Sequence, residues 1–74
     1  MTLKKELIKS IAVLEEEIKQ LEIKRSRSQA SLIDALISKI EPEESEVQFF
    51  RTFTAEIELK REQLAKLNKK LETL

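Results

Sequence analysis

The stretch KIEPEESEVQ, Lys39 to Gln48, decides the fold because it holds the only proline of a 74-residue chain that has no glycine. Pro42 disfavours helical geometry at the residue before it and suits the first position of a new helix, where its missing N–H is not needed. Glutamates follow at Glu43, Glu44 and Glu46, as expected for the first turn of a helix. The stretch therefore predicts a corner at 41–43 that ends one helix and starts another.

On both sides of this corner, apolar residues recur in alternating steps of three and four, the pattern of helices that pack on other helices. Before the corner they are Leu7, Ile11, Leu14, Ile18 and Leu21, and after it Phe50, Phe53, Ile57, Leu64, Leu67, Leu71 and Leu74, with Lys60 as the polar exception. The pattern predicts one helix over about 3–40 and a second over about 43–73. Since the connection is short, the expected fold is all-α: a single domain, 1–74, in which two long helices form an antiparallel hairpin.

The stretch KRSRSQAS, Lys24 to Ser31, interrupts the first apolar stripe, which then resumes in a rotated phase as Leu32, Ile33, Leu36, Ile37 and Ile40. A change of phase accompanies either a continuous, bent helix or a true break. The alternative to a hairpin is therefore three helices, with a break near Ser26 to Ser31. If the hairpin turns at Pro42, Arg25 of the first helix lies opposite Lys60 of the second. This pairing predicts one polar layer shared by both helices. The nearby carboxylates expected to pair with these cations are Glu22, Glu56 and Glu58.

The same fold sets Leu14 opposite Leu71 and Ile18 opposite Leu67. One hairpin does not cover all the remaining apolar side chains, and exposed patches of that extent usually mark an interface. We expect a homodimer, two hairpins forming a four-helix bundle. The residues expected to serve self-association are Ile11, Leu14, Ile18, Leu21, Leu64, Leu67 and Leu71, and the surface expected to meet another protein is Ile37, Ile40 and Phe49.

Charge predicts the orientation of the two copies. Residues 1–10 and 65–74 hold six lysines and two glutamates, a net charge of +4, whereas residues 33–52 hold two basic and five acidic residues, a net charge of −3. The two groups lie at opposite ends of the predicted hairpin. Hairpins should therefore associate head to tail, with the corner of one beside the open end of the other.

Catalysis is not expected, because the chain has no His, Cys or Tyr to act as base or nucleophile. No cofactor, metal, small-molecule substrate or membrane is predicted, and the cytoplasm is the expected compartment. The leading hypothesis is a non-enzymatic protein–protein interaction module, a small accessory, regulatory or assembly subunit. The alternative is a nucleic-acid-associated factor that contacts phosphates through Lys24, Arg25, Arg27 and the basic open end, although 14 basic residues balance 14 acidic ones.

Overall fold

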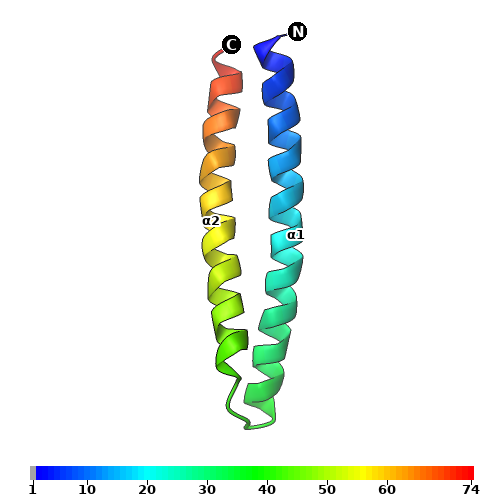
Figure 1. The fold of residues 1–74 in the computed structure, drawn as a ribbon, viewed down its shortest axis with the longest axis vertical. Helices are drawn as coiled ribbons and strands as arrows, with labels where there is room; N and C mark the ends of the chain where they lie inside the picture. The colour runs from blue at the N-terminus through cyan, green and yellow to red at the C-terminus, as the bar shows by residue number, and fades with distance from the viewer. Residues whose placement is uncertain (1) are drawn as a thin grey trace.

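The computed structural model describes residues 2–74 and contains two helices, α1 (Leu3–Ile37) and α2 (Glu44–Glu72), joined by residues 38–43. The helices run antiparallel, so the start of α1 and the end of α2 lie at the same end of a rod (Figure 1). The rod measures 56 × 16 × 14 Å, and a helix of 35 residues accounts for about 52 Å of its length at 1.5 Å per residue. The predicted all-α antiparallel hairpin is confirmed.

The residues of the two helices that face each other form an inner seam. In α1 the spacing of its residues, in alternating steps of three and four, continues from Leu7 to Ala35. Leu7, Ile11, Leu14, Ile18 and Leu21 are buried, and the same alternation of three and four residues continues through Arg25, Ser28, Leu32 and Ala35, of which Ser28 is buried and the others half-buried. α1 is thus one helix through Lys24 to Ser31, and the three-helix alternative is wrong. Since neither glycine nor proline lies in this stretch, nothing in it opposes helical geometry.

The inner seam of α2 follows the predicted positions. Ile57 is completely buried and packs with Leu14, Ile18 and Leu21 of α1. Phe53, Leu64 and Leu67 are half-buried and pack against this cluster. The core of the hairpin is therefore a thin line of side chains along one stripe of each helix, as expected for only two helices.

α1 ends three residues earlier than predicted, because Lys39 adopts the left-handed conformation with φ of 56°. The backbone N–H of Ile40 donates to the carbonyl of Ala35 at 2.8 Å, and that of Lys39 donates to the carbonyl of Leu36 at 3.1 Å. These two bonds form a Schellman motif, which satisfies carbonyls at the end of a helix. The chain is therefore turned away from the helix axis before it reaches Pro42.

α2 begins at Glu44, with Glu43 in extended conformation as its N-cap. Pro42 consequently precedes the cap instead of occupying the first helical position, so that part of the prediction is wrong. The Glu43 side chain makes no capping hydrogen bond, whereas at the start of α1 the Thr2 hydroxyl accepts a bond of 3.3 Å from the backbone N–H of Lys5. The dipole of α2 is complemented at both ends, by Glu44 and Glu46 in the first turn and by Lys69 and Lys70 in the last.

The alignment of the two helices differs from the prediction. Lys60 donates to Glu17 at 2.5 Å and shares a groove with Leu21, whereas a fold about Pro42 places it opposite Arg25. Leu67 likewise lines a groove with Leu14, so residues of α2 face residues that lie about one turn earlier in α1 than predicted. Lys60 and Arg25 do not form one shared polar layer, and each interrupts the apolar seam at its own level.

Candidate interaction surface

The residues predicted for self-association lie in the inner seam of a single hairpin. The four in α1, Ile11, Leu14, Ile18 and Leu21, are buried, and the three in α2, Leu64, Leu67 and Leu71, are half-buried. Their first role is to hold the two helices together. Because the leucines of α2 keep part of their surface exposed, the side of the seam formed by α2 is where a second copy could still contact it.

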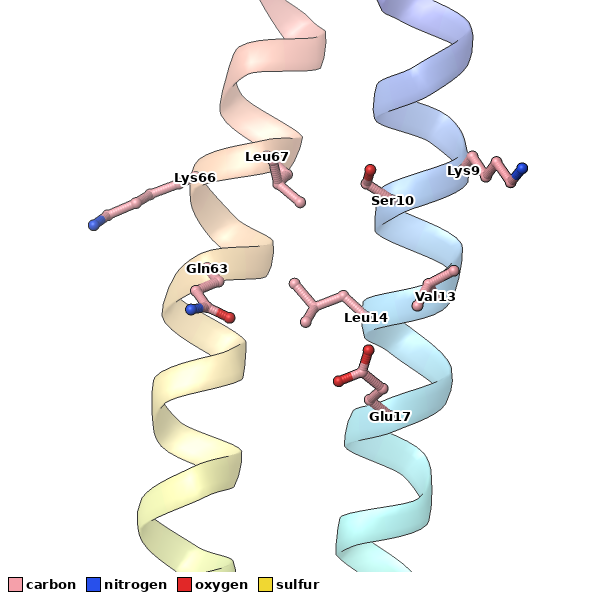
Figure 2. A pocket seen from close by; sticks show the side chains of 8 residues that line it. All are labelled: Lys9, Ser10, Val13, Leu14, Glu17, Gln63, Lys66 and Leu67. Carbon is pink, nitrogen blue, oxygen red and sulfur yellow. The ribbon is translucent and has the colours of Figure 1, made fainter.

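An apolar groove of about 600 Å³ runs between the helices in the open half of the rod. Figure 2 shows that Leu14 and Leu67 point into the space between α1 and α2, whereas Lys9 and Lys66 point away to either side. The remaining lining residues are Ser10, Val13, Glu17 and Gln63. The groove has an apolar floor and charged edges, which suits contact with another apolar side chain.

A second apolar stripe lies on the face of α1 turned away from α2. It consists of Ile23, Ser26, Ala30, Ile33 and Ile37, which recur in steps of three and four, and we call it the outer seam. The isoleucines are 39%, 46% and 75% exposed in the order of the chain. Leu36 lies beside the outer seam and is 68% exposed. The hairpin leaves these apolar side chains uncovered.

A shallow groove of about 460 Å³ follows the first half of the outer seam. Ile23, Ser26 and Ala30 line it, together with Lys19, Glu22 and Arg27. Ser26 and Ala30 are small, and they leave the depression between Ile23 and Ile33. A helix whose large side chains recur at the same spacing would fill it.

The three residues predicted to meet another protein are all exposed, but they lie on different faces. Ile37 belongs to the outer seam, and Ile40 lies past the end of α1, in a recess that it lines with Ser31 and Ala35. Phe49 lies on α2, where its ring stacks on Phe53 with centroids 6.3 Å apart. A single small partner would not contact all three at once, so the surface as predicted divides into separate patches.

The basic cluster is also distributed around the helix. Lys24 lies in a groove with Glu16, Glu17 and Glu56, and Arg25 is half-buried at the inner seam. Arg27 lies beside Lys19 and Glu22, and it is a surface neighbour of Lys24, three residues earlier in the helix. Arg25 at the inner seam is therefore separated from the other two cations, and Lys24 and Arg27 both have carboxylates as neighbours.

The charged ends of the rod are located as predicted. The lysines of residues 2–10 and 65–74 lie at the open end, where α1 starts and α2 ends, and the acidic residues 41–46 lie at the corner (Figure 1). Between these ends, ion pairs join the helices. Besides the contact between Lys60 and Glu17, Arg61 donates to Glu22 at 2.6 Å. Both pairs are partly exposed, so each contributes about 1 kcal/mol or less.

Within residues 2–74, no three His, Cys, Asp or Glu side chains lie close enough to hold a metal ion. The same residues include no helix whose length and apolar character would let it span a bilayer. Comparisons of the chain with protein-family models, curated proteins and solved structures gave no match.

Proposed function

We propose that this chain is a non-enzymatic protein–protein interaction module, a small cytoplasmic accessory, regulatory or assembly subunit whose first partner is a second copy of itself. The observation that supports this is the imbalance between covered and uncovered apolar surface. Among residues 2–74, six large apolar side chains are buried, whereas eleven are between 39% and 75% exposed. Exposed apolar surface on this scale is typical of a chain that buries it against another.

The charge distribution supports a head-to-tail arrangement of two copies. A rod with lysines at one end and glutamates at the other is repelled by a parallel neighbour and attracted by an antiparallel one. At physiological salt, screening acts over about 8 Å, so charge selects the orientation while apolar burial supplies most of the affinity. Two hairpins related in this way contribute four helices to one twofold assembly, which is the proposed four-helix bundle.

The proposed role needs no catalytic group, and the composition of the chain agrees with that, since it lacks His, Cys and Tyr. The nucleic-acid alternative has less support from the geometry, because Arg25 is half-buried at the inner seam and glutamates lie beside Lys24 and Arg27. Its remaining basis is the lysines at the open end.

The test is the molar mass in solution, measured by light scattering after size exclusion over a dilution series. A species of twice the 8.6 kDa chain mass that dissociates on dilution is the expected result. Circular dichroism at each concentration shows whether the dissociated chain keeps its helices. A helical chain that stays monomeric at every concentration contradicts self-association, and the exposed apolar surface would then belong to a different protein.

A further inference from the structure

We infer that the outer seam of α1 is the surface on which a second copy docks, antiparallel and offset, so that only the corner halves of the two rods overlap. The inference rests on the proposed self-association and specifies its contact surface. Because the outer seam faces away from α2, the four helices of this dimer lie in a row and overlap only in part, in place of the fully overlapped four-helix bundle. Its basis is that the outer seam is complementary to itself in shape when the two copies run antiparallel, and that the charges flanking it then form ion pairs.

Shape complementarity follows from the order of large and small residues. If two outer seams pair so that the residue numbers in each layer sum to about 63, Ser26 faces Ile37 of the second copy and Ala30 faces its Ile33. Each layer then combines a small side chain with a large one. Because the dimer has twofold symmetry, each of these two pairs occurs twice along the contact. Layers of this kind fill the space between two helices without a void. The shallow groove beside Ser26 and Ala30 is the depression that Ile33 and Ile37 of the second copy would occupy.

A parallel pairing of the same seams does not pack in this way. Each residue in the centre of the outer seam would then face its own equivalent in the second copy. Ala30 would meet Ala30 and leave a gap, and Ile37 would meet Ile37 in a crowded layer. Both outcomes lower stability, the first by losing contacts and the second by strain. Shape alone therefore favours the antiparallel arrangement.

The charges that flank the outer seam complement the antiparallel arrangement. Arg27 and Asp34 are exposed and flank the outer seam on the same edge, seven residues apart. In the antiparallel pairing, Arg27 of each copy lies next to Asp34 of the other, which gives two symmetric ion pairs. Like-charged residues do not face each other along this edge of the antiparallel pair. The lysines at the open ends stay free at both extremities of the offset dimer.

Cysteine cross-linking tests the arrangement directly, because the chain has no cysteine of its own. A mixture of the variants Ala30→Cys and Ile33→Cys should form the mixed disulfide readily on mild oxidation, since these positions share a layer. A mixture of Ile8→Cys and Ile37→Cys is the matched control, because these positions come together only if the rods overlap fully, open end to corner. Preferential cross-linking of the control mixture overturns the offset arrangement and leaves self-association intact. A chain that is monomeric at all concentrations contradicts both.

A charge exchange tests the register through a different property. Arg27→Asp or Asp34→Arg alone should raise the dissociation constant of the dimer by roughly tenfold, because two attractive contacts become repulsive. The double variant, Arg27→Asp with Asp34→Arg, restores both pairs and should return the constant to within about threefold of the original. Arg51→Asp, an exposed charge reversal on α2, controls for net charge and should have little effect. A double variant as weak as either single one overturns the inference.

Discussion

Lys39 occupies a backbone conformation that suits glycine better than any residue with a Cβ atom. Its φ of 56° is needed for the Schellman motif that ends α1, and a side chain in this region costs about 1 kcal/mol. Lys39→Gly should therefore raise the free energy of unfolding by roughly 0.5–1 kcal/mol. The measurement is urea denaturation followed by circular dichroism at one fixed protein concentration.

Lys39→Ala is the matched control, because it removes the lysine side chain and keeps the Cβ atom. Its stability should stay close to that of the original chain. If alanine stabilises as much as glycine, the gain comes from loss of the amino group, and the backbone explanation is wrong. The same residue shows why the end of α1 was predicted three positions too late. A left-handed lysine has no sequence signature, whereas Pro42 has a strong one, so the prediction placed the corner at the proline.

At the scale of the two helices, the hairpin depends on one residue of α2 that has no exposed surface. Ile57 is 0% exposed, whereas Leu59, two residues later, is 56% exposed. Ile57→Ala should lower the free energy of unfolding by about 2–4 kcal/mol, through lost burial and the cavity left behind. Leu59→Ala should change it by less than about 0.5 kcal/mol, as for most exposed positions. Thermal and urea unfolding of both variants at the same concentration provide the measurement.

Equal losses from the two substitutions would show that Leu59 is buried in an assembly, and would place α2 at the contact between copies. That outcome would count against the outer seam of α1 as the only contact. A small loss at Ile57 would mean that the inner seam tolerates a cavity. The assignment of the core to the cluster around Ile57 would then be wrong.

The helices themselves were predictable because the spacing of apolar residues reports directly on which face is buried. Their alignment was not, since it depends on where the corner turns, and a shift of a few residues in the corner moves every facing pair. The outer seam was hidden for another reason. Leu32 and Ala35 continue the inner seam while Ile33 and Ile37 belong to the outer one. Two stripes that overlap in one helix resemble a single stripe that has changed phase.

At the scale of the whole molecule, a neutral rod with charged ends should respond to salt differently in the two proposed roles. For self-association, raising the salt from about 50 to about 500 mM screens the exposed ion pairs but leaves apolar burial in place. The dissociation constant of the dimer should therefore rise by less than about tenfold. Light scattering or sedimentation at several concentrations in each buffer provides the measurement, and a larger rise would mean that charge, not the apolar seam, holds the copies together.

The nucleic-acid alternative makes the opposite prediction in the same buffers. Binding to phosphates releases counterions, so an affinity built on several contacts falls by about a thousandfold over a few-fold rise in salt. Fluorescence anisotropy of a labelled 20-nucleotide single strand and a 20-base-pair duplex should show no binding even at the lowest salt, because glutamates lie beside Lys24 and Arg27 and the chain has no net positive charge. Binding that falls steeply with salt, and that is lost when Lys4, Lys5 and Lys9 are replaced by alanine, would assign the open end to nucleic acid. In the offset dimer, the two basic open ends would then lie at opposite extremities of one assembly. A long nucleic acid would bridge both ends, whereas a short probe would contact only one.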